Sequence, residues 1–356
     1  MRVEWILEPA EFAAIAEPWD RLAATARSPF MRQAWLRCWW TAFTDEARPA
    51  VCTLWDGEDL AGGLPLLRDG RTVRAMANDH TPRFAALARD AGALDRLADE
   101  AVRRGGAELR LAGVPEDDPL LPSLGRASAR GRRRWVVEPE SVSLVTETDG
   151  PLGAYRARMR PNFREIERRR RKLAREHEVR WQLVERPADL DAELEAGLRV
   201  EASGWKGREG TAIRSDERVH RFYRSIAHAF AADDELRFST LTMDGEPVAW
   251  DFALLSDGRY WLLKTAYDEA QARLGPGMAL RLSVIERCFE LGLAAHEFLG
   301  VAMEWKRRFA TSERALVTAR SYAPRPVPAA RGLYRARLRP LAREVRDRLR
   351  QRGSDG

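Results

Sequence analysis

Two Asp-Gly pairs thirteen positions apart most constrain the fold of this chain. Asp244-Gly245 and Asp257-Gly258 separate three runs rich in β-branched, aromatic and aliphatic residues, at 236–243, 247–255 and 259–266. An Asp-Gly pair supplies the backbone conformation that a two-residue hairpin turn requires. The segment therefore predicts a three-stranded antiparallel meander.

A glycine-rich turn follows the meander and precedes an amphipathic helix expected over 277–291. The turn is Gly275-Pro276-Gly277, with Arg273 two residues before it. The first N–H groups of a helix have no partner inside the helix and attract anions, and glycine lets a ligand approach the backbone. The sequence predicts either a phosphate or diphosphate site here or a helix start without a ligand.

The first half of the chain repeats part of this pattern. Strands expected at 51–55 and 60–67 flank Asp56-Gly57, and the step from Asp56 to Asp244 equals the step from Ala61 to Ala249, at 188 positions. Together with the order of the elements, this repeat predicts two related α/β halves. We expect domains at 1–150 and 151–325, followed by a proline linker and a basic tail at 326–356.

Other segments give local expectations. The spacing of apolar residues predicts helices over 10–44, 84–104, 188–203 and 216–232, and residues 115–134 are expected to be irregular. Pro161 suits the early turn of a further helix, because a missing N–H costs nothing there. Pro324, Pro326 and Pro328 are expected to form a linker before the tail.

The positive charge is concentrated in two segments of the chain. The net charge is +6, yet residues 156–175 hold ten basic residues against Glu165 and Glu167, and residues 331–352 hold nine arginines against two acids. A segment of this kind binds nucleic acid, an anionic membrane or an acidic protein, or is a solvated helix face. tRNA is one candidate partner of 156–175, and the amphipathic 331–352 either docks on its own protein or contacts an anionic membrane.

Composition excludes several classes of protein. No apolar run is long enough for a membrane span, and acidic residues interrupt the N-terminus where a signal peptide would be apolar. The three cysteines lie far apart, and no cluster of histidine and cysteine predicts a metal site. We expect a cytoplasmic protein, with contact to the inner membrane face through the tail as an alternative.

At this point the chain resembles a known family. Residues 155–323 are similar to the GNAT acyltransferase superfamily, in the branch shared by cellulose-biosynthesis-associated GNAT proteins and Fem-type peptidyltransferases. The segments that carry the resemblance are Ser203-Gly204-Trp205-Lys206-Gly207, Lys264-Thr265-Ala266-Tyr267-Asp268, Gly275-Pro276-Gly277, Glu297-Phe298-Leu299-Gly300 and Glu304-Trp305-Lys306-Arg307-Arg308-Phe309. It implies an α/β fold with a mixed, mostly antiparallel sheet in tandem GNAT-like domains.

The resemblance also implies a reaction and the residues that perform it. An acyl group would pass from acyl-CoA, most simply acetyl-CoA, to an amine of a small molecule, sugar or peptide, with no tightly bound cofactor. A backbone N–H within 262–265 would stabilise the oxyanion, and Lys306 would stabilise it or protonate the leaving group. The candidate bases are Glu201, Asp251 and Asp268. The donor-binding candidates are Lys264, Thr265, Arg273, Gly275, Gly277 and Met278. The substrate-binding candidates are Trp205, Lys206, Tyr267, His80 and Trp305.

The sequence departs from the superfamily at three places. Ala272 stands where the acyl-CoA signature has Gln or Arg, Glu297 replaces the usual Asp, and no tyrosine follows this strand before Tyr322. Two alternatives therefore stand beside the acyl-CoA enzyme. One is a Fem-like transferase that takes an aminoacyl group from tRNA, and the other is a non-catalytic binding protein with a GNAT fold.

Overall fold

The chain forms two compact units, each built from segments distant in sequence. The computed structural model describes residues 1–44 and 47–335, and it describes only the backbone of Trp205 and Lys206. The first unit comprises residues 1–26, 44–140 and those from 315 onward, and the second comprises 27–43 and 141–314. The basic segment 331–352, for which a membrane contact is predicted, lies largely outside the described residues.

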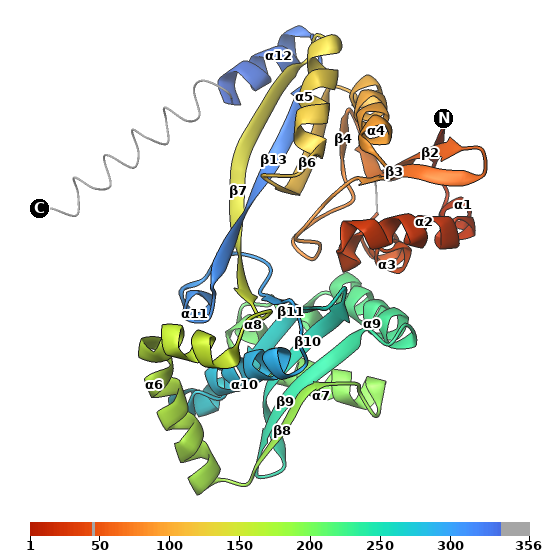
Figure 1. The fold of residues 1–356 in the computed structure, drawn as a ribbon. Coiled ribbons are helices and arrows are strands. Elements are labelled where there is room, and N and C mark those ends of the chain that lie inside the picture. The colour runs from red at the N-terminus through yellow and green to blue at the C-terminus, as the bar shows by residue number, and fades with distance from the viewer. Residues whose placement is uncertain (45–46, 336–356) are drawn as a thin grey trace, which may run out of the picture. The chain divides into compact units, whose positions relative to one another are not determined.

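The first unit is a sheet with helices on it (Figure 1). Strands β1, β2, β3 and β4 pair in that order as antiparallel neighbours, and β6 then joins β4 in parallel. Its elements are β1 (Arg2–Ile6), α1 (Pro9–Ala14), α2 (Ala16–Ala23), η1 (Ala24–Ala26), β2 (Arg48–Asp56), β3 (Asp59–Asp69), β4 (Thr72–Ala75), β5 (Leu87–Ala88), α4 (Ala91–Arg104), β6 (Glu108–Pro115), α5 (Leu120–Arg130), the start of β7 (Arg134–Glu147) and α12 (Pro326–Leu333).

The second unit contains the predicted meander. Strands β8, β9, β10 and β11 pair as antiparallel neighbours, and β12 joins β11 in parallel. Its elements are η2 (Pro29–Met31), α3 (Gln33–Phe43), α6 (Leu152–Glu176), β8 (Val179–Glu185), α7 (Leu190–Ser203), α8 (Trp205–Arg208), η3 (Ile213–Ser215), α9 (Glu217–Ala232), β9 (Leu236–Met243), β10 (Glu246–Ser256), β11 (Arg259–Tyr267), η4 (Glu269–Leu274), α10 (Pro276–Glu290), β12 (Ala295–Glu297), α11 (Glu304–Arg307) and the start of β13 (Ser312–Tyr322).

The two units repeat one order of elements. In each, a strand and helices precede a three-stranded meander, then a helix, a strand parallel to the third meander strand, another helix and a final strand. The first hairpin of the second unit turns at Asp244-Gly245, and that of the first unit turns at Gly57-Glu58, directly after Asp56. Gly245 and Gly57 have φ values of +87° and +65°. The predicted relation between the halves therefore extends over the whole order of elements.

Three segments belong to a different unit from the one that their position in the sequence suggests. Helix α3 lies in the second unit, where Trp35 and Phe43 contact Phe222 of α9 at ring-centroid distances of 5.4 and 4.9 Å. The last strand, β13, pairs with β6 in the first unit, while the end of β7 pairs with β12 in the second. The compact units therefore exchange segments along the chain. The continuous domains at 1–150 and 151–325 stay a prediction.

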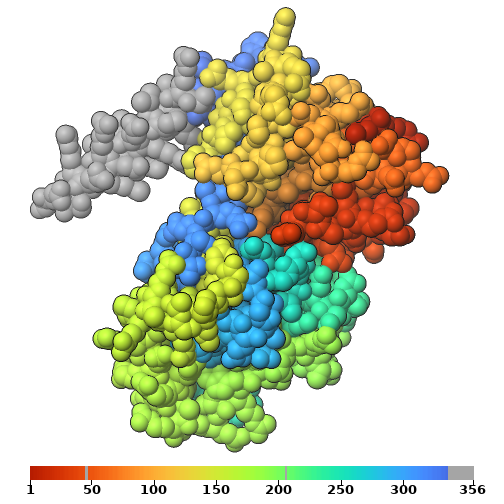
Figure 2. All heavy atoms as spheres, in the orientation of Figure 1, coloured from red at the N-terminus to blue at the C-terminus, as the bar shows by residue number. Residues whose placement is uncertain are grey.

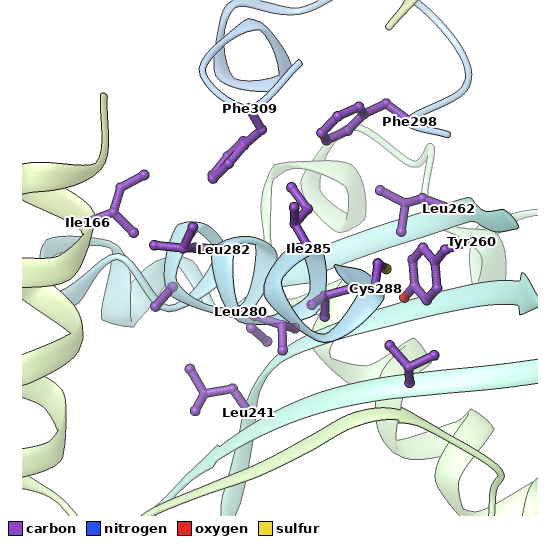
Figure 3. Close-up of a cluster of buried hydrophobic side chains, with 14 of the residues drawn as sticks. Ile166, Leu241, Tyr260, Leu262, Leu280, Leu282, Ile285, Cys288, Phe298 and Phe309 are labelled. Carbon is purple, nitrogen blue, oxygen red and sulfur yellow. The ribbon is translucent and has the colours of Figure 1, made fainter. Parts of the chain in front are cut away.

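The core of the second unit lies between the sheet and the pair α6 and α10. Figure 3 shows Leu280, Leu282 and Ile285 of α10 among Leu241, Tyr260 and Leu262 of the strands, with Ile166 of α6 beside them. Phe298 and Phe309, from the chain after β12, close the same cluster. Burial of these side chains, each worth about 1.5–3 kcal/mol, fixes α10 against the sheet and so fixes where its N-terminus lies.

Several local expectations were wrong. Helix α6 begins at Leu152, so Pro161 lies in its interior, and the helix continues because Tyr155, Met159 and Phe163 bury one face across the proline. The segment 115–134 contains α5, whose buried leucines were hidden among Pro, Gly and Ser. The expected helix at 84–104 begins only at Ala91, after the Asp90 cap, and the expected linker begins helix α12 at Pro326.

Candidate functional site

A β-bulge in β11 marks the candidate site. Leu262 pairs with Ala253 and Lys264 pairs with Phe252, so Leu263 has no counterpart on β10. On the other side, β12 pairs with residues 259–261, and β11 continues beyond that ladder to Tyr267. Bulges re-aim side chains and are frequent next to active sites. Here the bulge lies directly after the end of the ladder between β11 and β12, which makes the backbone of 262–267 the candidate for contact with a ligand.

The bulge decides which face each following residue of β11 occupies. Lys264 turns toward α9, where its Nζ lies 5.0 Å from the centre of the Tyr223 ring. Thr265 turns toward α10, where its hydroxyl accepts a hydrogen bond from Arg281 at 3.2 Å. Tyr267 also turns toward α10 and lies against Gly277. Strand alternation without the bulge would place each of these residues on the opposite face.

The N-terminus of α10 has the features of an anion site. Gly275 adopts φ = +65°, a left-handed conformation that favours glycine, and no side chain caps the helix. Pro276 has no N–H, and helix geometry leaves the N–H groups of Gly277 and Met278 without an intrahelical partner. The Arg169 side chain of α6 passes 3.1 Å from where a Cβ on Gly275 would lie. Backbone donors, the helix dipole and a guanidinium therefore converge here.

The other donor-binding candidates lie around this turn. Arg273 is exposed in η4, directly before the turn. Met278 is half-buried and packs against the core cluster, so its side chain belongs to the helix packing while its N–H belongs to the turn.

The three candidate bases have different surroundings. Asp251 is fully buried, and its Oδ1 accepts a hydrogen bond from Arg281 at 2.5 Å, so it is an ion-paired carboxylate inside the sheet. Asp268 caps η4 by accepting the N–H of Ala270 at 3.0 Å. Glu201 of α7 is 2% exposed and accepts the N–H of Ile213 at 2.9 Å.

Glu201 lies on the face that Lys264 enters. The pKa of the Tyr223 hydroxyl is raised well above its usual value, first by burial and then by the charge of Glu201. Lys264 of β11 contacts the ring of the same tyrosine. Tyr223 therefore links this candidate base with residues 262–267 of β11.

Lys306 holds the loop that forms the other side of the strand separation. Its Nζ donates to the carbonyl oxygens of Leu299 at 2.7 Å and Val301 at 2.9 Å. Leu299 and Gly300 both have positive φ values, +53° and +56°, so the ammonium stabilises a loop whose backbone is strained at a leucine. Trp305 is half-buried, and Lys306 lies 5.7 Å from its ring centre.

Three predicted substrate residues are not brought together with these groups. His80 is in the first unit, so its proposed approach to this site remains a prediction. Trp205 and Lys206 lie in α8, directly after α7, but their side chains are outside what the structure describes. Tyr267, by contrast, lies at the site and is 40% exposed.

Sequence reasoning missed the buried polar network beneath the site. Arg281 of α10 and His296 of β12 are 1% and 0% exposed, and they bond to each other at 2.9 Å. The available signal was the charge of Arg281 inside the apolar run from Met278 to Ile285. A charged residue in such a run is seldom fully buried unless it is paired.

Comparison with known proteins now identifies this unit. Residues 160–307 match the family model described as an acetyltransferase (GNAT) domain. The chain contains a GNAT domain. The match covers the meander, the glycine turn, α10, β12 and Lys306, and it confirms the resemblance and the expectation of an acyltransferase domain. The first unit repeats the order of elements of the GNAT domain, which confirms a mixed, mostly antiparallel α/β fold in tandem GNAT-like halves.

Solved structures with similar folds cover nearly the whole chain. One is the C-terminal domain (DUF2156) of a putative lysylphosphatidylglycerol synthetase from Agrobacterium fabrum, with a TM-score of 0.56, 13% identity, and coverage of 88% of this chain and 92% of that one. Another is FemX, with a TM-score of 0.56, 10% identity, and coverage of 89% and 97%. No curated relative matches the sequence. At these identities the likeness concerns the fold.

Among the described residues, no helix combines the length and the apolar character needed to cross a bilayer.

Proposed function

We propose that the GNAT domain transfers an acyl group from acyl-CoA to an amine. The observation that carries the proposal is the separation of β11 from β12 beside the uncapped N-terminus of α10. The backbone of 262–267, beyond the ladder with β12, suits the amide-rich arm of coenzyme A, which can pair with it as a further strand does. The turn at Gly275 suits the diphosphate at the end of that arm.

The chemistry requires three functions from the protein. The amine nitrogen attacks the acyl carbonyl carbon, a tetrahedral oxyanion forms, and the carbon–sulfur bond then breaks to release the thiolate of coenzyme A. We assign the oxyanion to a backbone N–H at the bulge, within 262–265, because preorganised N–H donors stabilise such charge best. Glu201 takes the proton of the amine through a water molecule. This carboxylate is buried, and its charge raises the pKa of Tyr223, whose ring Lys264 contacts.

Lys306 is assigned to the leaving group. Its ammonium lies at the loop that follows β12, and two carbonyl bonds hold its position. A cation fixed in this way stabilises the departing thiolate and is able to return a proton to it. Asp251 and Asp268 take structural roles in this proposal, because one is paired with Arg281 and the other caps η4.

The first unit supports the proposal by contrast. The helix that corresponds to α10 is α4, and its N-terminus is capped by Asp90, whose Oδ1 accepts the N–H of Ala93 at 2.8 Å. This bond is the main cause that lowers the pKa of Asp90, so the cap is a carboxylate at neutral pH. A diphosphate would meet a negative charge there. The donor site is therefore proposed for the second unit alone.

Turnover of acyl-CoA tests the proposal. Purified full-length protein is incubated with acetyl-CoA and a panel of amines, including amino sugars and peptides, and release of free thiol is followed. The proposal expects thiol release that depends on the amine and falls at least tenfold in Glu201→Gln. A series of acyl-CoAs that neither bind in calorimetry nor react with any amine would overturn it and favour a non-catalytic binding protein.

A second candidate donor is aminoacyl-tRNA, and one observation on α6 favours it. Arg160, Arg164, Arg171 and Arg175 are exposed, and their spacing places them within about 60° of one another around the helix. Within the described part of the chain these four have no ion pair, whereas Arg156 and Arg170 bind Glu286. Figure 2 shows the yellow-green atoms of α6 at the surface of the second unit.

The salt dependence of tRNA binding distinguishes this candidate. Four arginine contacts to phosphate predict a slope of log affinity against log salt of roughly −3 to −4. Replacing Arg164 and Arg171 by glutamine would reduce that slope by about 2. Absence of binding at low salt would remove tRNA as the donor.

Contact of the 331–352 tail with anionic vesicles remains a separate proposal, tested by cosedimentation of the full chain and a chain ending at Pro328.

A further inference from the structure

A buried arginine connects the strands where β11 and β12 separate. Arg281 donates from Nη2 to Asp251 of β10 at 2.5 Å and to Thr265 of β11 at 3.2 Å, and from Nη1 it bonds His296 of β12 at 2.9 Å. His296 lies within the short region where β12 still pairs with β11, opposite Tyr260. Thr265 lies beyond that region, in the part of β11 that follows its ladder with β12. One guanidinium therefore holds both sides of the separation.

The network fixes the position of the guanidinium from two directions. Asp251 supplies the opposite charge that a fully buried arginine requires. Burial and the charge of Arg281 lower the pKa of His296 well below its usual value, so its ring is neutral and its Nε2 accepts the arginine N–H. The ring of Tyr260 stacks on His296 with a centroid distance of 5.0 Å. The third contact, to Thr265, is therefore made by a group that has little freedom to move.

We propose that Arg281 is a positioning residue that holds residues 262–267 of β11 at a fixed separation from β12, so that the backbone N–H groups beside the bulge are aligned for the acyl carbonyl. This inference rests on the proposed function for its catalytic consequence. Its structural part, the restraint of residues 262–267 through Thr265, is independent of any substrate.

The reason for a dedicated restraint is that the ladder between β11 and β12 ends at Trp261. Residues 262–267 lie beyond this ladder, and the bulge interrupts pairing to β10 at Leu263. A strand segment with an interrupted ladder opens more readily than a fully paired central one. An oxyanion donor must nevertheless be placed to within about half an ångström. The Arg281 bond to Thr265 supplies a restraint from the helix face.

Hydrogen–deuterium exchange of the full chain tests the restraint without substrate. Thr265→Val removes the hydroxyl and keeps the shape, and it should accelerate exchange of the 262–267 amides at least tenfold. Thr265→Ser keeps the hydroxyl and should stay within threefold of the wild type. Thr242→Val, on β9, makes the same substitution away from the network and should leave these amides unchanged. Unchanged exchange in Thr265→Val would overturn the proposal.

A double-mutant cycle shows whether Thr265 acts through Arg281. Arg281→Lys keeps the charge beside Asp251 but lacks the planar group that reaches His296 and Thr265 together. If Thr265 acts through this bond, Thr265→Val should accelerate exchange less than twofold further in the Arg281→Lys background. Effects that multiply would contradict the coupling. Should Arg281→Lys fail to fold, the comparison of Thr265→Val with Thr265→Ser decides alone.

Kinetics then test the catalytic consequence. With acyl-CoA and an accepted amine, Thr265→Val should lower kcat at least tenfold while the KM for the donor changes less than threefold, and Thr265→Ser should recover most of the loss. Equal losses in Thr265→Val and Thr265→Ser would contradict the positioning role. A wild-type protein without turnover would refute the proposed function, whereas the exchange result would still decide the restraint.

Discussion

Gly277 lies directly against the ring of Tyr267, so that a Cβ at Gly277 would stand 3.0 Å from the nearest ring carbon. The contact joins the first turn of α10 to the end of β11, the two elements between which the donor is proposed to bind. A larger side chain would displace the ring or the helix start. The space at this glycine is therefore part of the proposed diphosphate site.

Gly277→Val should weaken the binding of coenzyme A at least tenfold, which corresponds to about 1.4 kcal/mol. Isothermal calorimetry measures the affinity. Gly153→Val is the matched control, because a Cβ there meets nothing within 4 Å and the residue lies outside the site. Equal affinities for Gly277→Val and the wild type would place the donor elsewhere.

Lys306→Ala should lower kcat at least tenfold and also reduce stability. The substitution removes the ammonium proposed to act on the leaving group and leaves the carbonyls of Leu299 and Val301 without this donor. An unsatisfied buried acceptor costs about 1–3 kcal/mol. Lys306→Arg, which retains a cation, should recover part of the stability but little of the activity. Normal kinetics in a folded Lys306→Ala protein would remove Lys306 from the mechanism.

One chain should bind one molecule of coenzyme A. The glycine turn of α10 is uncapped, whereas Asp90 caps the corresponding helix α4 with a carboxylate. Calorimetric titration should give a stoichiometry near one, and Gly277→Val should weaken the whole signal. Two sites per chain, or a signal that survives Gly277→Val and disappears in Asp90→Ala, would assign donor binding to the first unit.

Because of His296, the free energy of unfolding should decrease as the pH is lowered below about 6.5. An unfolded histidine binds a proton below about 6.5, while the pKa of the folded His296 lies well below that value, so the unfolded state binds more protons in this range. The contribution is constant above pH 6.5 and decreases by up to about 1.4 kcal/mol per pH unit below it. Urea unfolding at several pH values measures this slope.

The variant that tests this slope is His296→Gln. The glutamine carbonyl at 296 is able to accept from Arg281, and the substitution should reduce the pH slope by one proton between about pH 5 and 6.5. An unchanged slope in His296→Gln would show that this ring takes up its proton in the folded state.

Local signals predicted much of the second unit. The Asp-Gly turns and the glycine turn specify conformations that few other residues adopt, so the meander and the start of α10 followed from them. The start of α6 could not be predicted in this way, because packing of Tyr155 and Phe163 overrides the local preference of Pro161. The segment exchange of α3 and β13 depends on long-range contacts that no local pattern records.

The residues of the candidate site also divide into those that the sequence predicted and those that it did not. Gly275 and Gly277 were predicted from the glycine turn, and Tyr267 and Thr265 from the family resemblance. These residues lie at the start of α10 and at the end of β11, and their roles stay predictions. The faces they occupy could not be predicted, because the bulge at Leu263 reverses the alternation of β11. Arg281 was missed since its role arises only from the meeting of α10 with three strands.

A crystal structure with bound acyl-CoA tests the central claim most directly. The account predicts the amide-rich arm along residues 262–267 of β11, the diphosphate at the N–H groups of Gly277 and Met278, and the acyl carbonyl at the bulge. Coenzyme bound away from β11, or a separation between β11 and β12 that stays filled by the protein's own side chains at saturating ligand, would contradict it.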